Sequence, residues 1–149
     1  MAAEYSANAL QTVPANGSVI FTESPVPCNQ GLIYHRDGSG LFRLANRFFR
    51  QNIMSCCRRN SDYLVSVSAN IAVPTGGTVE PISFALAIDG EVDPSTIMIF
   101  TPAAVEQFGN ISAVAVAKVP YICACSTVSL RNVSTQPVDI QNVNIVFGK

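Results

Sequence analysis

Apolar and polar residues alternate most regularly between positions 63 and 73 of this chain. In that window every second side chain is apolar, namely Tyr63, Val65, Val67, Ala69, Ile71 and Val73, and Ser66, Ser68 and Asn70 lie between them. Successive side chains of a β-strand point to opposite faces, so this period of two predicts a strand with one buried face. The residues at 74–78, Pro-Thr-Gly-Gly-Thr, predict the turn that ends it.

Shorter runs of the same kind recur along the chain, separated by turn-forming residues. The other runs that predict strands are 18–23, 31–35, 40–44, 82–88, 95–101, 111–119, 126–133 and 138–147. The segment Arg36-Asp37-Gly38-Ser39 has hairpin-turn chemistry, and only 103–108, preceded by Thr101 and Pro102, is compatible with a helical turn. Residues 111–119 are apolar on nearly both faces, which predicts a strand buried within a sandwich or between subunits.

About eight to ten short strands with turns between them indicate an all-β protein. The architecture that fits best is an antiparallel two-sheet jelly-roll sandwich. An immunoglobulin-type sandwich fits less well, because the chain has no Trp. The length of 149 residues is typical of one domain. We therefore expect a single jelly-roll domain over 1–149, in which 1–17 form an N-terminal arm or the first strand.

Charged residues make up 13% of the chain, about half the usual ~25%, whereas the apolar fraction of 48% is ordinary. A surface with so few charges predicts that other subunits cover part of it. The net charge of −1 gives no general attraction to nucleic acid or to an anionic membrane, so we expect neither as a partner. The first residues lack the basic start and apolar run of a secretory signal, which predicts synthesis and folding in a cytoplasm.

Few side chains here are suited to catalysis. The chain has one His, and a Cys28–His35 or Ser39–His35 pair would lack a third group to orient it. We expect no enzymatic activity and no cofactor. The segment Asp89-Gly90-Glu91-Val92-Asp93 brings three carboxylates together, which is compatible with a hard cation. It lacks the length and ligand spacing of a calcium loop, so a hairpin turn is the preferred interpretation.

The five cysteines are Cys28, Cys56, Cys57, Cys123 and Cys125. The last four of them offer an alternative as a zinc site, but zinc ribbons place two residues inside each cysteine pair, and neither pair here has that spacing. Adjacent cysteines do not easily reach disulfide geometry, and a reducing cytoplasm disfavours the bond. We expect buried free thiols, and whether Cys56, Cys57, Cys123 and Cys125 bind metal stays open.

A basic and aromatic segment lies between positions 35 and 59. It holds six of the nine Lys and Arg residues, all of them Arg, with a single acid, Asp37. Guanidinium groups bind carboxylates in bidentate fashion, and both Arg and aromatic residues are enriched at protein interfaces. The candidate partner-binding residues are Arg47, Phe48, Phe49, Arg50, Arg58 and Arg59. We expect them to contact a neighbouring subunit in preference to a phosphate backbone.

Several segments resemble a known superfamily. The run 63–74 (YLVSVSANIAVP) followed by 82–90 (ISFALAIDG), with the closing run 138–147, resembles the trimeric jelly-roll heads of the tumour-necrosis-factor and complement type. The opening 5–13 (YSANALQTV) and the segment 70–77 (NIAVPTGG) are similar to small proteins encoded among the virion genes of tailed phages of gut Firmicutes. These are strand and turn patterns, and they cover most of the chain apart from the Arg-rich stretch 43–60.

This resemblance implies a homotrimer that acts as a structural protein of a tailed bacteriophage virion, decorating the capsid or forming a short head fibre. No collagen-like or coiled-coil stalk accompanies the head, so a long fibre does not fit. The implied location is the virion, after assembly in the host cytoplasm. The implied partners are the phage capsid or another virion protein, to which the Arg-rich segment would bind, with a host-surface glycan as a further candidate.

The alternative from another class is a carbohydrate-binding or adhesin head domain on a bacterial cell or spore surface. Sugar sites are typically built from aromatic platforms with Asp and Asn on exposed loops. The chain has only four Tyr and no Trp, so the virion interpretation is preferred.

Overall fold

The computed structural model describes residues 2–28, 31–45, 61–119 and 126–149. Its strands are β1 (Ala2–Ala7), β2 (Gln11–Val13), β3 (Glu23–Val26), β4 (Ile33–His35), β5 (Phe42–Leu44), β6 (Ser61–Ala72), β7 (Ile82–Ile88), β8 (Glu91–Val92), β9 (Met98–Phe100), β10 (Gly109–Val119), β11 (Ser126–Asn132) and β12 (Val138–Gly148). One turn of 3₁₀ helix, η2, spans Pro94–Thr96. In these parts of the chain no helix is long and apolar enough to cross a membrane.

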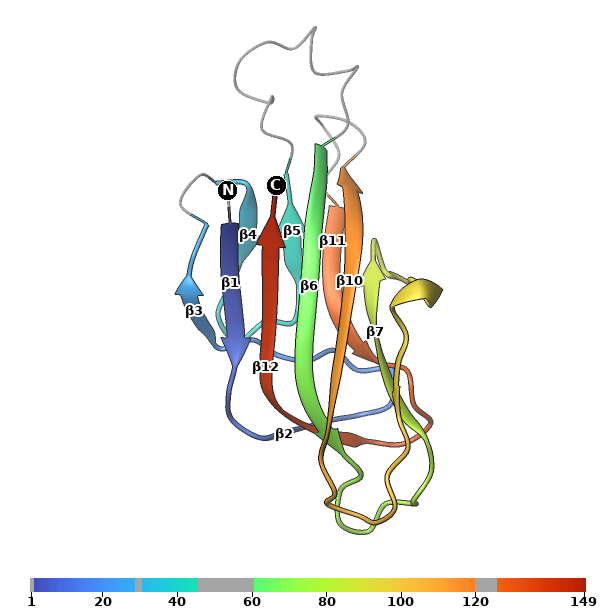
Figure 1. Cartoon of the computed structure of the whole chain (residues 1–149). Helices are drawn as coiled ribbons and strands as arrows, with labels where there is room; N and C mark the ends of the chain where they lie inside the picture. The colour runs from blue at the N-terminus through green and yellow to red at the C-terminus, as the bar shows by residue number, and fades with distance from the viewer. Residues whose placement is uncertain (1, 29–30, 46–60, 120–125) are drawn as a thin grey trace, which may run out of the picture.

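The strands form two sheets that pack face to face (Figure 1). Sheet A has the order β10–β6–β12–β1–β3, with β2 also paired to β12. Sheet B has the order β4–β5–β11–β7–β8, with β9 also paired to β7. Every pairing between these strands is antiparallel. The prediction of an all-β, antiparallel two-sheet jelly roll is confirmed.

The core lies between the sheets, and the predicted alternation fills it. On β6 the side chains of Tyr63, Val65, Val67, Ala69 and Ile71 are all buried. Phe42 of β5 lies at the centre of an aromatic cluster, with its ring centroid 4.9 Å from that of Tyr5 on β1 and 5.1 Å from that of Phe147 on β12. These rings join the two sheets, because Tyr5 and Phe147 come from sheet A and Phe42 from sheet B.

Residues 138–148 form the central strand of sheet A, and their alternation of buried and exposed side chains is interrupted at one point. The first half of β12 pairs with β2 and the second half with β1. Between Gln141 and Asn144 the register with β6 shifts, and Asn142 adopts a φ of 51°. This bulge moves the buried side from even positions, such as Ile140, to odd positions, such as Ile145. Both halves of the strand therefore face the core.

Three local predictions need correction. Residues 18–23 do not form a strand of their own; they make isolated bridges at Ser18 and Phe21, and the strand begins at Glu23. The strand predicted over 95–101 is shortened to β9, because Asp93 caps η2 by accepting a hydrogen bond from the backbone N–H of Ser95. Residues 103–108 form bends and a turn instead of a helical turn.

Both predicted hairpins are confirmed. β4 and β5 pair across Arg36-Asp37-Gly38-Ser39. The β7–β8 turn is made by Asp89 and Gly90, whose φ values of 54° and 84° suit the turn type that matches the twist of a two-residue hairpin. Asp89 also accepts a 3.0 Å hydrogen bond from the backbone N–H of Thr127. The Asp89 carboxylate therefore binds β11, and the Asp93 carboxylate caps η2. The segment 89–93 forms the hairpin turn of the preferred interpretation.

Candidate functional site

The outer face of sheet A carries apolar side chains that no part of the described chain covers. The exposed fractions are 53% for Leu64, 63% for Val114, 58% for Val116 and 37% for Val146. These four side chains are hereafter the apolar patch. Strand register places Val116 opposite Leu64, and places Ser66 between Val114 and Val146. The patch thus occupies two adjacent rows across β10, β6 and β12.

The patch is almost free of charge. Its two rows continue onto β1 through Ala2 and Glu4, which pair with Gly148 and Val146. Glu4 is the single charged residue in these rows, and its carboxylate accepts a hydrogen bond from the side-chain amide of Asn144. An antiparallel sheet face that remains in water normally alternates apolar-in with polar-out. This face instead has the composition of a surface that another protein covers.

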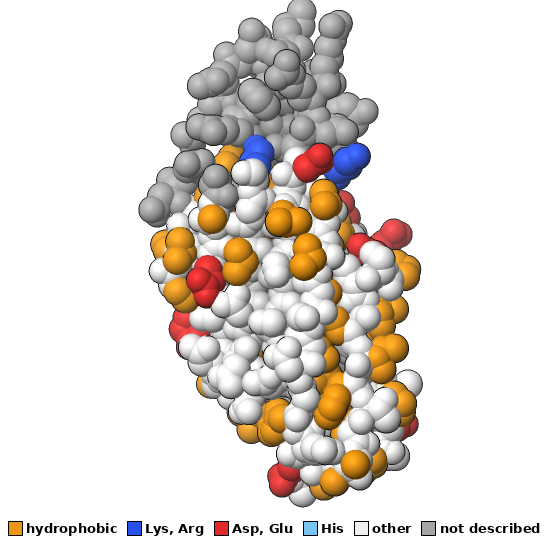
Figure 2. All heavy atoms as spheres, in the orientation of Figure 1, with side chains coloured by type: hydrophobic (Ala, Val, Ile, Leu, Met, Phe, Trp, Pro, Cys, Tyr) orange, Lys and Arg blue, Asp and Glu red, His pale blue; other side chains and the backbone are white. Residues whose placement is uncertain are grey.

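The other half of the same face is polar but uncharged. It consists of Ser68 and Asn70 on β6, Ser112 and Asn110 on β10, and Asn144 on β12. Asn110 donates a 3.0 Å hydrogen bond to the side-chain oxygen of Asn70. Figure 2 shows this division, with orange side chains gathered in the half of the face nearer the two termini and white surface below them. Across β10, β6 and β12, the rows from Leu64 to Asn70 contain no charged residue and can be desolvated without burying a charge, whereas Asp62 and Lys118 form the next row beyond Leu64.

The strand predicted over 111–119 is confirmed as β10, and its burial is confirmed for the face toward the sandwich, whereas burial of the other face between subunits stays a prediction. In β10 the residues Ile111, Ala115, Ala117 and Val119 are buried, as expected. Val114 and Val116 face outward, because successive side chains of a strand alternate between its two faces, and nothing in the described chain packs on that side. Burial within the sandwich explains only one face of this strand.

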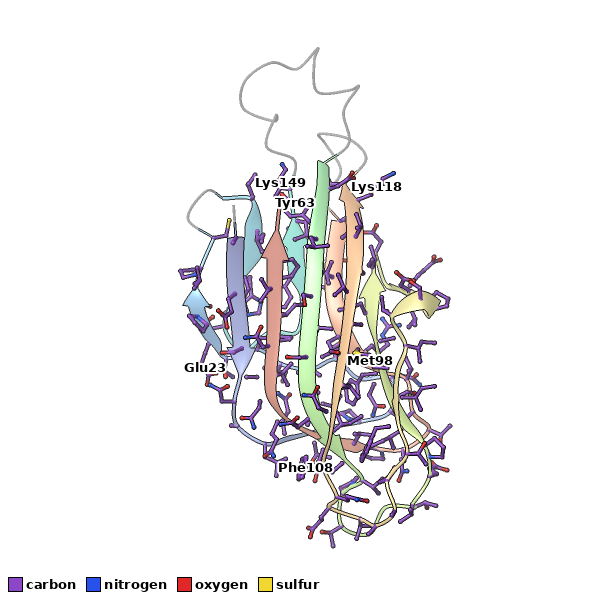
Figure 3. All side chains as sticks on the ribbon, in the orientation of Figure 1. Glu23, Tyr63, Met98, Phe108, Lys118 and Lys149 are labelled. Carbon is purple, nitrogen blue, oxygen red and sulfur yellow. The ribbon has the colours of Figure 1, made fainter. Side chains whose placement is uncertain are left out.

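Cationic side chains gather at the end of the sandwich where both chain ends lie (Figure 3). Lys118 is exposed at the end of β10, and the Nζ atom of Lys149 lies 5.3 Å from the centre of the Tyr63 ring. The Tyr63 hydroxyl donates a hydrogen bond to the carbonyl oxygen of Ala45. Burial raises the pKa of Tyr63 to about 12, so this hydroxyl keeps its proton over the physiological range.

The Arg-rich segment is bounded by residues at this same end. β5 ends just before residues 46–60 and β6 begins just after them, and these two strand ends lie at the same end of the sandwich as the two chain ends (Figure 1). The six predicted partner-binding residues Arg47, Phe48, Phe49, Arg50, Arg58 and Arg59 fall outside the described residues. Cys56, Cys57, Cys123 and Cys125 also fall outside them. The roles predicted for all ten residues remain predictions.

The only histidine is used by the fold. His35 stacks on Phe42 with 4.3 Å between ring centroids. Its Nδ1 atom lies 3.2 Å from the carbonyl oxygen of Leu41, and its Nε2 atom lies 3.3 Å from that of Phe21. Because both ring nitrogens face backbone carbonyls, His35 is paired with neither Cys28 nor Ser39. Among the described residues, no group of three His, Cys, Asp or Glu side chains is placed to hold a metal ion.

Sequence reasoning identified β10 as unusual but missed the patch as a surface. Leu64, Val114 and Val116 stand at the polar positions of two long strands, a signal that the sequence does contain. Val146 could not be assigned to the same face from the alternation alone, since the bulge at Asn142 changes the side on which later residues lie.

Comparison with known proteins shows the fold. No family model matches the chain, and no curated protein sequence matches it. Among solved structures, murine APRIL at pH 5.0 aligns with a TM-score of 0.64 and 5% identity over 100% of both chains. The Eiger TNF of S. frugiperda aligns with a TM-score of 0.63 and 10% identity, over 100% of this chain and 92% of that one. A family 35 carbohydrate-binding module from Clostridium thermocellum reaches a TM-score of only 0.38 and carries no weight. This protein therefore has the jelly-roll fold of tumour-necrosis-factor proteins.

Proposed function

We propose that this protein is a non-catalytic structural component of a tailed-phage virion, which assembles as a homotrimer and decorates the capsid or forms a short head fibre. The observation that carries the trimer is the apolar patch on sheet A, whose rows contain one charged residue. The assignment to a virion rests on the sequence resemblance at 5–13 and 70–77. Nothing catalytic is required of such a component.

Self-association would bury the apolar surface that the patch still exposes. Burying a whole Val or Leu side chain is worth ~1.5–3 kcal/mol, so each half-exposed member leaves about 1 kcal/mol still to be gained. The same patch is repeated on every copy, and a closed ring of identical subunits buries it several times. A second copy of this chain is therefore the partner that best fits the low-charge face.

Capsid docking is assigned to the end that carries the chain ends. β5 ends and β6 begins at that end, on either side of residues 46–60, and Lys118 lies there as well. The segment contributes Arg47, Arg50, Arg58 and Arg59, and guanidinium groups bind the carboxylates of a protein shell in bidentate fashion. In a trimer three such contacts act together, so modest individual affinities add through avidity.

The trimer is tested by light scattering at micromolar concentration, which should give about three times the chain mass of 15.9 kDa. A Val114→Asp, Val116→Asp double variant should become monomeric, because each interface would bury unpaired carboxylates. Val105→Asp is the control, since this exposed Val lies in the 101–108 connection that precedes β10, outside the rows of the apolar patch. A wild-type protein that remains a monomer refutes the trimer, and a double variant that stays trimeric refutes the patch as its interface.

Virion association is tested by particle binding. Wild-type protein should co-purify with phage particles, and an Arg58→Glu, Arg59→Glu variant should fold but lose occupancy, with weaker binding at higher salt. Cryo-electron microscopy of the native particle would show the docking surface directly. A protein found on a bacterial cell or spore surface instead would support the adhesin alternative.

A further inference from the structure

The outer face of sheet B presents one aromatic ring to solvent. Of the three Tyr residues that the structure describes, Tyr5 and Tyr63 are buried, whereas Tyr34 on β4 is 68% exposed. Register places Arg43 of β5 directly beside Tyr34, and places Thr127 of β11 beside Arg43. A ring, a guanidinium and a hydroxyl therefore form one row across three adjacent strands.

None of these three side chains serves the fold. The side chains of Tyr34, Arg43 and Thr127 make no hydrogen bond, ion pair or ring contact with any part of the described chain. The nearest acid in register terms, Asp89, is engaged by the backbone N–H of Thr127 and the hydroxyl of Ser126. Arg43 therefore keeps an unpaired positive charge next to an exposed aromatic face, without a local carboxylate to neutralise it.

We propose that Tyr34, Arg43 and Thr127 form a binding site for an acidic sugar, that is, a pyranose ring carrying a carboxylate. The C–H face of a sugar ring packs on an aromatic face such as Tyr34. The guanidinium of Arg43 matches the planar geometry of a carboxylate and can bind it with two parallel hydrogen bonds. The hydroxyl of Thr127 can both donate to and accept from a sugar hydroxyl.

The dimensions of the row suit such a ligand. Neighbouring strands lie about 4.8 Å apart, so the row spans about 10 Å from β4 to β11. The site is a flat surface on one subunit, so a single sugar should bind weakly. Several copies on one assembly would raise the apparent affinity for a polymeric glycan. This gain in affinity rests on the proposed trimer, whereas the site itself does not, since all three residues come from one chain.

The site lies on sheet B and the apolar patch on sheet A, so the two surfaces do not compete within a subunit. Self-association through sheet A leaves the row on sheet B open to a ligand. A neutral glycan would leave the charge of Arg43 unpaired, and an anion without a ring would leave Tyr34 unused. The combination favours a ligand that has both features.

The test uses saturation-transfer NMR on the full-length protein with trigalacturonic acid, and with its methyl ester as the neutral counterpart. We expect the acid to bind at least ~10-fold more tightly than the ester, because only the acid pairs with Arg43. Binding of sialic acid is measured in parallel. Tighter binding of sialic acid would indicate a sialylated glycan as the ligand, and tighter binding of trigalacturonic acid would indicate a uronate polymer. Equal binding of acid and ester would overturn the proposal without any variant being made, as would failure of both acids to bind.

Variants then assign the residues. Tyr34→Ala and Arg43→Gln should each weaken binding of the acid at least ~10-fold, whereas Tyr34→Phe should retain it because the ring face remains. Lys118→Gln, which removes the same charge from the other sheet, is the matched control and should bind like the wild type. Undiminished binding by Arg43→Gln would overturn the site. Light scattering on the same samples reports assembly, so failure of the trimer and failure of the sugar site are read separately.

Discussion

Gly109 begins β10 at a point where the sandwich leaves no room for a side chain. A Cβ atom built there would lie 2.2 Å from Cε2 and 2.4 Å from Cδ2 of the Phe100 ring. Phe100, on β9, packs against the core, so its ring cannot move away without losing contacts. Gly109→Ala therefore forces two well-packed strands apart.

Overpacking of this kind typically lowers the free energy of unfolding by about 1–3 kcal/mol. The opposing gain from replacing a strand Gly is about 0.5–1 kcal/mol, so the net effect should be destabilising. Urea denaturation of the wild type and the variant, at one protein concentration, measures the difference. In a Phe100→Leu background the Cβ has space, and Gly109→Ala should become neutral or stabilising.

The double-mutant cycle separates this contact from a backbone effect. Gly76 is the control, because its φ is +86° and no atom lies within 4 Å of its Cβ position. Gly76→Ala should destabilise the protein equally in both Phe100 backgrounds. If Gly109→Ala costs the same with Leu as with Phe at position 100, or costs nothing at all, the packing argument at this corner of the sandwich is wrong.

Three further predictions concern other parts of the chain. Asn132 is fully buried, and its side-chain amide donates hydrogen bonds to the carbonyl oxygens of Val13 and Gln136. Asn132→Ala should therefore lower the free energy of unfolding, measured by urea titration, by about 1–3 kcal/mol. An unchanged midpoint would contradict this. Because burial raises the pKa of Tyr63 to about 12, the stability that its protonated hydroxyl contributes is complete below pH ~10 and is lost as the pH rises through about 12. Burial also raises the pKa of Tyr5, so urea denaturation at several pH values should show a larger loss of stability in the wild type than in Tyr63→Phe, and equal losses would contradict this. Serine replacement of both Cys56 and Cys57 should leave assembly intact by light scattering and lower stability modestly, whereas loss of folding together with bound zinc in the wild type would show a metal site.

The long strands could be predicted from the sequence, and the short edge strand β3 could not. β6 is long and flanked on both sides, so burial of alternate residues imposes a clear period of two. β7 keeps its larger apolar side chains at even positions, although Ala85 and Ala87 on its other face are buried as well. β3 is at the edge of sheet A and contains Pro25, and three of its four residues are exposed. An edge strand needs few apolar residues in alternation, so the sequence pattern predicts a strand over the more apolar residues 18–23 instead.

The candidate surfaces were predictable in composition but not in position. The Val residues of β10 are visible in the sequence, yet a run that is apolar on both faces does not say whether the cover is another sheet or another subunit. The row of Tyr34, Arg43 and Thr127 joins residues that are up to 93 positions apart, as the strand register shows. Only the pairing of β4, β5 and β11 brings them together, and that pairing is a property of the whole fold.

The position of β12 between β1 and β6 has a consequence for how the protein is made. Residues 138–148 pair with the earliest strands on one side and with a strand from the middle of the chain on the other. Until the ribosome has released them, the nascent chain has no centre to sheet A, and both β1 and β6 present unpaired edges that can join other chains. Closure of sheet A must therefore wait until residues 138–148 have left the ribosome, and it requires contacts between residues that are more than a hundred positions apart, which makes folding intrinsically slow. A cell that produces many copies at once would expose these open edges to one another before the sheet can close.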